Sequence, residues 1–537
     1  MVHDSKAQII TEGRASLGIE LGSTTIKACL IGPGGTVLAE GAHEWENQLV
    51  DGHWSYALPD VWAGIADAYA ALARSVADSY AVTLTRLAHI GISAMMHGYL
   101  AFDAAGELLV AFRTWRDTTT ARAADELTDA LGVNIPLRWS VAHYYQALLD
   151  GEPHVGRVAY LTTLAGYVHW RLTGRKVLGI GDAVGMFPID VTTRDYDEAR
   201  LAAFDALAAT HGARTPLRDL LPEVLVAGTD AGELSEAGAR LLDPTGTLHP
   251  GARACPPEGD AGTGMVATNA VRPRTGNVSV GTSIFAMIVL EGDLAGLHRE
   301  IDPVTTPAGD PVAMVHCNNG AAEIATWMNV LAEAVTASLG YDVEKSRVYD
   351  ACLGAALTGP ADAGGVLAYN YLSGEPLSGL AEGRPLVART PASTLSLATF
   401  MRAQLFGAYA TVRMGMEILH DEGVAVDVVY GHGGLFRTPV VAQRLLAAAL
   451  EAPVGIAESA STGGAWGIAL LARYLDHAEE LSLADYLDRH VFAGVTPDVI
   501  APDADDVAGF TAYLAEYRRG LAIQPPAAQS LRYGLDD

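Results

Sequence analysis

This 537-residue chain lacks long apolar runs and closely spaced cysteines. No apolar run approaches the roughly 20 residues that a membrane-spanning helix needs, so we expect no membrane segment. Only four cysteines occur, and no two have C-x-x-C spacing: Cys29, Cys255, Cys317 and Cys352. This spacing favours neither a zinc site nor a disulfide framework, and it predicts buried free thiols in a reducing compartment.

Positive charge is also scarce. Lys and Arg number 35 against 63 Asp and Glu, which gives a formal net charge of -28. A surface this acidic repels nucleic acids and anionic membranes, and we expect neither as a partner. It also repels nucleotide phosphates, so a nucleotide site must be built locally from a metal ion, backbone N–H groups and a few cations. The first sixteen residues are polar and lack the apolar stretch of a signal peptide, so we expect a cytoplasmic protein.

Hydrophobic residues make up half of the chain, and its length predicts at least two domains. The opening segment predicts an antiparallel meander of strands at 17–21, 25–31 and 36–39, because turn residues separate the three apolar runs. This is not the strand–helix start of a dinucleotide-binding fold. A helix is predicted from Pro59, and its buried face at helical spacing consists of Val61, Ile65, Tyr69, Leu72 and Val76.

An internal sequence repeat indicates how the chain is organised. The segment VSVGTSIFAMIVL at 278–290 repeats the opening pattern LGIELGSTTIKACLI: an apolar strand, a Gly with two hydroxyl residues, and another apolar strand. We therefore predict a duplicated α/β architecture with domains 1–270 and 271–537. The second half predicts helices at 394–420 and 439–450, strands at 426–430 and 454–457, and a last long helix opened by TGGAWGIALLARYL. Residues after Ile523 are expected to be peripheral.

Each of the two glycine- and hydroxyl-rich turns is a candidate phosphate-binding loop, because backbone N–H groups in such turns bind anions. The first offers Ser23, Thr24, Thr25 and the nearby cation Lys27, and the second offers Gly281, Thr282 and Ser283. One such turn alone would be read as an ordinary hairpin, and the pair favours binding. Glu20 immediately precedes the first turn, where a carboxylate could hold Mg²⁺ directly or through water.

Three further motifs offer chemistry for a polyhydroxy substrate. Asp260 lies in a glycine-rich loop, either as a helix cap or as a general base that takes a proton from a sugar hydroxyl. Met96 and His97 end a buried strand, where a ligand could reach them, although a lone His is more often structural. Trp115 and Asp117 share a loop with an arginine, which suits a sugar or an exposed salt-bridged turn about equally.

Glycine-rich turns also follow strands in the second half. Gly433 and Gly434 lie between a strand and a helix, but Phe436 occupies a position that G-x-G-x-x-G requires to be Gly. A nicotinamide dehydrogenase is therefore disfavoured. The turn would still let an adenine or ribose lie on the backbone, and Gly464 opens a helix that could pack against the same nucleotide. Close helix–sheet packing is the alternative for both.

In their order along the chain, these motifs resemble the FGGY carbohydrate kinase family, and within it the xylulokinases most closely. The similarity extends from about Leu17 to Leu475. GIELGSTTIK and SVGTS are similar to the family's two phosphate loops, GISAMMHG and FRTWRD to its sugar loops, and EGDAGTG to its catalytic loop. YNYLSGE resembles the Tyr-Leu-Ser-Gly-Glu element, and GHGG with STGGAWGIAL the adenosine side.

This resemblance implies two actin-like, ribonuclease H-like α/β domains with a nucleotide cleft between them, which bind ATP, Mg²⁺ and a sugar. It implies Asp260 as the base, Met96 and His97 as sugar contacts, and Gly433 and Gly434 as nucleotide contacts. The implied acceptor is a keto-sugar, first a ketopentose such as xylulose. Ribulose, fuculose or a polyol such as erythritol are alternatives, and a homodimer is one option because dimers are common in the family.

The chain departs from the family pattern at three places. Glu20 stands where the family usually has Asp, and His143 is nearest to a family Lys. Trp54-Ser55-Tyr56 replaces a Trp-x-Glu on what we interpret as the sugar side, which suggests an acceptor other than plain D-xylulose. An actin-like ATPase without a sugar substrate is the alternative from another class, and it would have no need for Asp260 or His97.

Overall fold

The computed structural model describes residues 5–456 and 463–534, which divide into two compact units. The first unit takes described residues within Met1–Arg272, Pro303–Val312 and Thr462–Gly494. The second takes those within Pro273–Asp302, Ala313–Ser461 and Val495–Asp537. The first break lies close to the predicted boundary at 270, but a single cut does not describe the units. The segments 303–312 and 463–494 group with the first unit rather than with 271–537.

The first unit is built on a sheet with strand order β13-β6-β1-β2-β3, and β14 also pairs with β6. The predicted meander is confirmed, because β1–β2 and β2–β3 are antiparallel pairs. Strand β6 joins β1 in parallel. The strands of this sheet are β1 (Ser16–Leu21), β2 (Thr25–Ile31), β3 (Val37–Glu44), β6 (His89–Ala94), β13 (Arg253–Ala254) and β14 (Glu258–Gly259).

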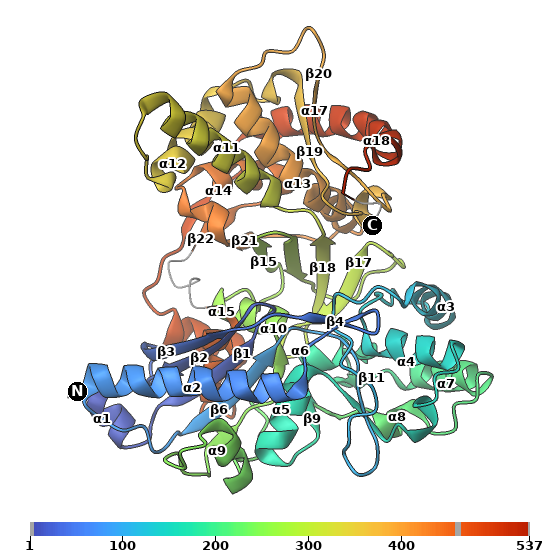
Figure 1. Cartoon of the computed structure of the whole chain (residues 1–537), viewed down its shortest axis with the longest axis vertical. Helices are drawn as coiled ribbons and strands as arrows, with labels where there is room; N and C mark the ends of the chain where they lie inside the picture. Colours follow the sequence, from blue (N-terminus) through green and yellow to red (C-terminus); the bar gives the residue numbers. More distant parts are fainter. Residues whose placement is uncertain (1–4, 457–462, 535–537) are drawn as a thin grey trace. The chain divides into compact units, whose positions relative to one another are not determined.

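Two helices cover the two faces of this sheet. Helix α2 (Leu58–Tyr80) packs on β2 and β3, and its five predicted core residues are all buried (Figure 1). Side chains alternate along a strand, so Leu17 and Ile19 of β1 join the α2 core while Gly18 and Glu20 face the other way. On that other face lies α15 (Gly463–Tyr474). A Cβ on Gly18 would come within 2.1 Å of the Ala465 carbonyl oxygen, so only glycine permits this close packing.

The remaining elements of the first unit are short helices and pairs of short strands around the sheet. The helices are α1 (Lys6–Thr11), α3 (Ala121–Leu131), α4 (Ser140–Leu149), α5 (Leu164–Thr173), α6 (Ile180–Ala183), α7 (Glu198–Ala209), α8 (Leu217–Leu220), α9 (Glu236–Leu242), α10 (Asp260–Ala267) and α16 (Leu483–Tyr486). The strands are β4 (Gln48–Val50), β5 (His53–Ser55), β7 (Leu100–Phe102), β8 (Tyr160–Thr162), β9 (Val177–Gly179), β10 (Ile189–Asp190), β11 (Asp195–Tyr196) and β12 (Glu223–Leu225).

The second unit is built on a sheet of strand order β17-β18-β16-β15-β21-β22-β23. Its strands are β15 (Thr275–Val280), β16 (Ile284–Val289), β17 (Ile301–Thr305), β18 (Pro311–Cys317), β21 (Val428–His432), β22 (Val454–Ile456) and β23 (Asp498–Ile500), and a separate hairpin has β19 (Val366–Asn370) and β20 (Pro385–Arg389). The order β18-β16-β15-β21 matches β3-β2-β1-β6 of the first unit, with an antiparallel hairpin followed by a parallel strand in both. The duplication predicted from sequence is therefore present in the topology.

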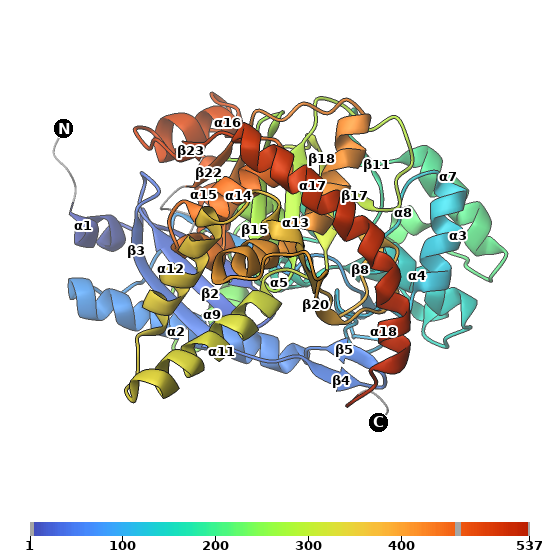
Figure 2. The same ribbon diagram turned by 90° about the horizontal axis from the view of Figure 1, so that it is seen from above.

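The central helix of this unit is the largely buried α13 (Leu397–Asp421). The other helices are α11 (Ala322–Leu339), α12 (Lys345–Ala355), α14 (Val441–Leu450), α17 (Ala504–Gly520) and α18 (Gln524–Ser530). Helix α13 contacts β16, the β19 hairpin and the helices α12, α14 and α17. The sequence reading did not anticipate α17, which runs towards α18 in Figure 2. The expectation of a peripheral end after Ile523 is only partly met, because Gln524 is fully buried and accepts a hydrogen bond from the backbone of Arg384.

Two expectations from composition can be checked within residues 5–456 and 463–534. All four cysteines are free and buried, as predicted. No helix in this part of the chain combines the length and the apolar character needed to cross a membrane. Ala457 of the predicted strand 454–457, and Ser461 and Thr462 of the STGGAWGIAL motif, lie outside the described residues.

Candidate active site

Glu20 and Lys27 face each other at the end of the first hairpin. They are directly paired in the β1–β2 register, on either side of the turn that contains Ser23 and Thr24. The Ala465 N–H donates to the Glu20 carboxylate at 3.3 Å, so the first turn of α15 points at this acid. Burial raises the pKa of Glu20, while the charge of Lys27 and the N–H groups of Ala465 and Gly464 oppose that rise.

Gly464 lies at the start of α15, in the first of the two compact units. The sequence predicts it, together with GHGG, on the adenosine side. A Cβ on Gly464 would come within 2.5 Å of a Glu20 carboxylate oxygen and 2.7 Å of the Thr263 hydroxyl. The helix belongs to this unit because it packs on β1, β6 and α10. Whether Gly464 contacts a nucleotide stays a prediction.

Asp260 is the first residue of α10 and follows directly on β14. The backbone N–H of Met96 donates to its carboxylate at 3.2 Å, which links the predicted base to the predicted sugar loop. The pKa of Asp260 is raised to about 6, first by the protein groups crowded around it and second by the negative charge of Glu20. Its side chain is nevertheless accessible to solvent, so the desolvation is partial and a ligand can reach the carboxylate.

Two further carboxyl groups, which the sequence reading did not single out as site residues, lie beside Asp260. Asp182 on α6 is buried and accepts a hydrogen bond of 2.6 Å from the Thr163 hydroxyl. Burial raises its pKa to about 7, and the charge of Asp260 adds to this. Glu258 immediately precedes the Gly259-Asp260 pair and is buried as well, and burial followed by the charge of Asp182 raises its pKa well above the usual range.

These four acids act on one another through their charges. A negative charge on one acid raises the pKa of the next: Glu20 acts on Asp260, Asp260 on Asp182, and Asp182 on Glu258. At neutral pH Asp260, with a pKa of about 6, is largely ionised. Among these four acids, Asp260 is the one that is well exposed to solvent.

The predicted sugar contacts fall into two groups. Met96 and His97 are buried beside the acids, and a Cβ on Gly185, which follows α6, would come within 2.5 Å of a His97 ring nitrogen. His97 has a left-handed backbone with φ of 70°, a strained conformation of the kind that clusters at functional sites. Asp117 belongs to a second group, away from the contacts of Met96 and His97. Its carboxylate accepts hydrogen bonds from Thr119 and His53, and its side chain is only 1% exposed.

The loop that carries Trp115 and Asp117 lies against the edge strand β5. The Thr114 N–H donates to the Trp54 carbonyl at 3.0 Å, and the Arg116 guanidinium lies 4.1 Å from the centre of the Trp54 ring. Trp115 is half-buried. His143 on α4 is completely buried and stacks on Tyr99, and its desolvation lowers the pKa to about 4, so this substitute for the family Lys carries no charge.

The second phosphate-loop candidate, Gly281–Ser283, joins β15 to β16. The carbonyls of Gly281 and Thr282 accept from the N–H groups of Ala321 at 2.8 Å and Gly320 at 2.6 Å. A trans peptide holds its C=O and N–H in opposite directions. The N–H groups of Thr282 and Ser283 therefore point away from the 320–321 backbone, on a loop whose Gly281 and Thr282 are exposed.

A buried polar network holds the 319–321 backbone in place. Glu375 is completely buried, and its carboxylate accepts from the backbone N–H of Asn319 at 3.2 Å and its side-chain amide at 3.1 Å. Burial raises the pKa of Glu375 to about 7, and these hydrogen bonds oppose the rise. On the other flank, a Cβ on Gly433 would come within 2.3 Å of the Val280 carbonyl oxygen, so the GHGG turn packs directly on the strand end that precedes Gly281.

The acids of the first unit fit a Mg²⁺ ion that is shared with substrate phosphates and water better than a metal ion whose ligands are all protein side chains. The described residues contain no group of three or more His, Cys, Asp or Glu side chains arranged to hold a metal ion. Mg²⁺ usually keeps several waters and takes only one or two carboxylates besides substrate phosphates. Glu20, adjacent to the first turn, fits that role, although the N–H groups of α15 already occupy part of its carboxylate.

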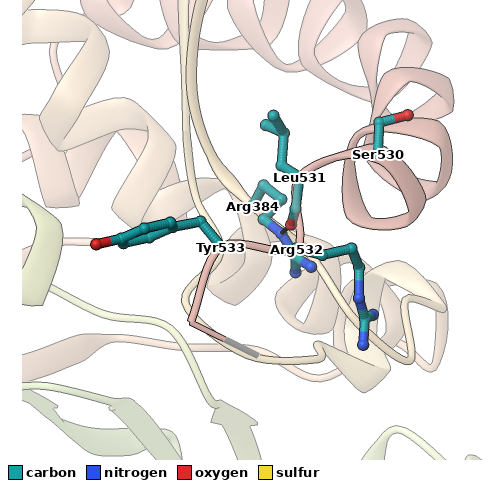
Figure 3. Close-up of a pocket in the computed structure, with 5 residues that line it drawn as sticks. All are labelled: Arg384, Ser530, Leu531, Arg532 and Tyr533. Atoms are coloured by element: carbon teal, nitrogen blue, oxygen red, sulfur yellow. Dashed lines mark hydrogen bonds between the residues drawn. The ribbon is translucent and has the colours of Figure 1, made fainter. Parts of the chain in front are cut away.

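A pocket of about 400 Å³ lies elsewhere, in the second unit. It is lined by Arg384 and residues 530–533, and Figure 3 shows the Arg384 guanidinium turned towards the Leu531 backbone. This guanidinium donates to the carbonyls of Leu531, Ala528 and Gly383. Arg384 therefore serves to fix the C-terminal segment, and none of the predicted site residues lines this pocket.

Comparison with known proteins gives two family matches. The model for the N-terminal domain of the FGGY family of carbohydrate kinases matches residues 15–243, and the model for its C-terminal domain matches residues 276–475. A xylulose kinase from Klebsiella pneumoniae is 25% identical over 286 residues, which are 52% of this chain and 55% of that protein. The chain spans about half the length, or less, of the curated relatives it matches.

Solved structures agree over nearly the whole chain. A xylulose kinase from Rhodospirillum rubrum superposes with a TM-score of 0.75 at 17% identity, covering 96% of this chain and 100% of that one. A gluconate kinase from Lactobacillus acidophilus gives a TM-score of 0.76 at 16% identity, with coverages of 96% and 98%. At such identities the likeness concerns the fold alone, and it confirms the predicted α/β fold with two actin-like domains.

Proposed function

We propose, since this chain belongs to the FGGY family of carbohydrate kinases, that it transfers the γ-phosphate of ATP to a hydroxyl group of a small keto-sugar or polyol. The observation that carries the proposal is Asp260. Its carboxylate is open to solvent, fixed by the Met96 N–H and shifted to a pKa of about 6. A base of that pKa is largely ionised at neutral pH and can still accept a proton.

In this reaction the Asp260 carboxylate takes the proton of the acceptor hydroxyl. The oxygen forms a bond to the γ-phosphorus, the bond from that phosphorus to the β,γ-bridging oxygen breaks, and ADP leaves. Phosphoryl transfer of this kind depends mainly on positioning and charge neutralisation. Both candidate phosphate loops would contribute through their N–H groups, with Lys27 as a cation: Ser23, Thr24 and Thr25 in one, and Thr282 and Ser283 in the other.

Mg²⁺ would supply charge neutralisation on the phosphates when bound, and Glu20 is the residue that we assign to hold it, directly or through water. Gly433, Gly434 and Gly464 stay proposed nucleotide contacts. For Gly433, its close packing on the Val280 carbonyl supports a place beside the second loop. The partners are then small molecules, and we expect the reaction in the cytoplasm, where ATP is abundant.

The acceptor that we favour is a ketopentose such as xylulose. The curated relatives that match are named xylulose kinases, whereas the solved structures also include gluconate and glycerol kinases. Met96 and His97 are the proposed sugar contacts next to the base. Trp115 and Asp117 are also proposed as sugar contacts. The structure gives Asp117 less support than Met96 and His97, because its carboxylate is buried and already accepts hydrogen bonds from Thr119 and His53.

A coupled assay of ADP release tests the proposal. Mg-ATP is offered with ketopentoses, ketotetroses, deoxy-ketohexoses and polyols, and one sugar should raise the rate strongly. Asp260→Asn should bind ATP normally and lose at least about a hundredfold in kcat, as expected when a general base is removed. A response to ribulose, fuculose or erythritol alone would identify a sibling kinase, and ATP turnover indifferent to every sugar would favour an actin-like ATPase.

A further inference from the structure

In the turn between β1 and β2, three consecutive carbonyl oxygens accept hydrogen bonds from Trp45 and Tyr56. The Trp45 indole N–H donates to the Gly22 carbonyl at 2.8 Å. The Tyr56 hydroxyl donates to the Ser23 carbonyl at 2.6 Å, and the backbone N–H of Trp45 donates to the Thr24 carbonyl at 3.1 Å. The carbonyl groups of residues 22–24 are therefore all held in fixed directions by hydrogen bonds.

These contacts determine where the amide groups of the turn point. In each trans peptide the N–H of the next residue is opposite to the carbonyl that is held. The N–H groups of Ser23, Thr24 and Thr25 are thus directed away from Trp45 and Tyr56. Thr24 at the tip is exposed, so these donors lie on the open side of the hairpin, as in backbone nests that bind anions.

The two anchors are themselves rigid. Trp45 and Tyr56 are 8% and 3% exposed, and their rings stack with centroids 4.2 Å apart. Trp45 directly follows β3, and Tyr56 lies between β5 and the start of α2. A sheet strand and a long helix therefore fix the two side chains that hold the turn.

We propose that Tyr56 and Trp45 are positioning residues for ATP, which preset the amide groups of residues 23–25 to receive its phosphates. This inference rests on the proposed function, because it assumes that the first turn binds ATP. It also gives a new interpretation of Tyr56, which the sequence analysis placed on the sugar side. Tyr56 stands where the family motif Trp-x-Glu has a carboxylate, and its hydroxyl contacts the first phosphate-loop candidate.

The test removes single donor groups and keeps the rings. Tyr56→Phe deletes the hydroxyl that holds Ser23 but retains the stack on Trp45. Tyr80→Phe is the matched control, because the Tyr80 hydroxyl donates to the Leu38 carbonyl at 2.7 Å, within the same unit and away from the turn. Each variant loses one tyrosine–carbonyl hydrogen bond, so both should lose similar thermal stability.

We expect Tyr56→Phe to raise the KM for Mg-ATP and the Kd for Mg-ADP by roughly five- to tenfold, with the sugar KM unchanged. Tyr80→Phe should stay within about twofold of wild type in all three. Trp45→Phe, paired with Trp62→Phe as its control, should repeat the pattern, because the Trp62 indole donates to the Tyr167 hydroxyl and not to a carbonyl of the turn.

Calorimetric binding of Mg-ADP without sugar separates the possible failures. If wild type binds Mg-ADP and Tyr56→Phe binds it as tightly as Tyr80→Phe does, the positioning role is refuted while the kinase proposal stands. If wild type binds no nucleotide, the proposed function fails and takes this inference with it. Should Trp45→Phe fail to fold, the tyrosine pair alone decides.

Discussion

Asp182→Asn offers a quantitative test of the buried acids. The carboxyl group of Asp182 is 1% exposed and has a pKa of about 7 instead of 3.8. In the unfolded chain this group ionises near its ordinary pKa, so between pH 4 and 7 the folded protein holds a proton that the unfolded chain has lost. Stability from this group is therefore lost as the pH rises. Asparagine has nearly the same shape, can still accept the Thr163 hydrogen bond and does not titrate.

The expected size follows from the shift. About three pKa units at ~1.4 kcal/mol each set an upper limit on the order of 4 kcal/mol. Between pH 5 and pH 8, linkage gives a gain of about 2–3 kcal/mol for Asp182→Asn relative to wild type. For a unit of this size that corresponds to a relative rise in Tm of roughly 5 °C.

Thermal unfolding followed by circular dichroism at half-unit steps from pH 5 to pH 8 measures this difference. Asp78→Asn is the control, because Asp78 is exposed on α2, and it should follow wild type at every pH. A Tm difference between Asp182→Asn and wild type that stays constant across the range would refute the raised pKa.

Three other variants or conditions test separate parts of the account. kcat/KM should fall about tenfold per pH unit below pH 6, because protonated Asp260 cannot act as a base, and a profile flat down to pH 5 would exclude it. Glu375→Ala should raise the KM for Mg-ATP several-fold by loosening Asn319, whereas the exposed Glu382→Ala should not; equal KM values in steady-state kinetics would contradict this. Gly18→Ala should cost about 1–3 kcal/mol in urea unfolding, because its Cβ would meet the Ala465 carbonyl, and an unchanged midpoint would contradict the close packing of α15.

Local pattern was sufficient for much of the fold. The meander β1–β3 followed from turn residues between apolar runs, and the core face of α2 followed from helical spacing. The repeat of GSTT as GTSI predicted the matching hairpin at β15–β16. These features depend on residues close in sequence, where periodicity and turn chemistry carry the information.

Features set by distant contacts could not be predicted in the same way. Helix α15 packs closely in the first unit because Gly18 on β1 and Gly464 and Gly467 on the helix carry no Cβ, but these glycines do not indicate which sheet the helix will meet. Asp182 and Glu258 are 76 positions apart along the chain, so their coupling appears only when α6 packs on β14. The one sequence signal for this coupling was Glu258, which immediately precedes the Gly259-Asp260 pair. Tyr56 could have been recognised only as a departure from a family motif.

The central claim is most directly tested by analysing the product. Wild type and Asp260→Asn are incubated with Mg-ATP and the sugar that gives the strongest response, and mass spectrometry is used to look for a phosphorylated sugar. The account predicts one sugar phosphate for each ADP with wild type, and at least a hundredfold slower formation with the variant. Release of ADP and inorganic phosphate without any sugar phosphate, or equal rates for the two proteins, would contradict it.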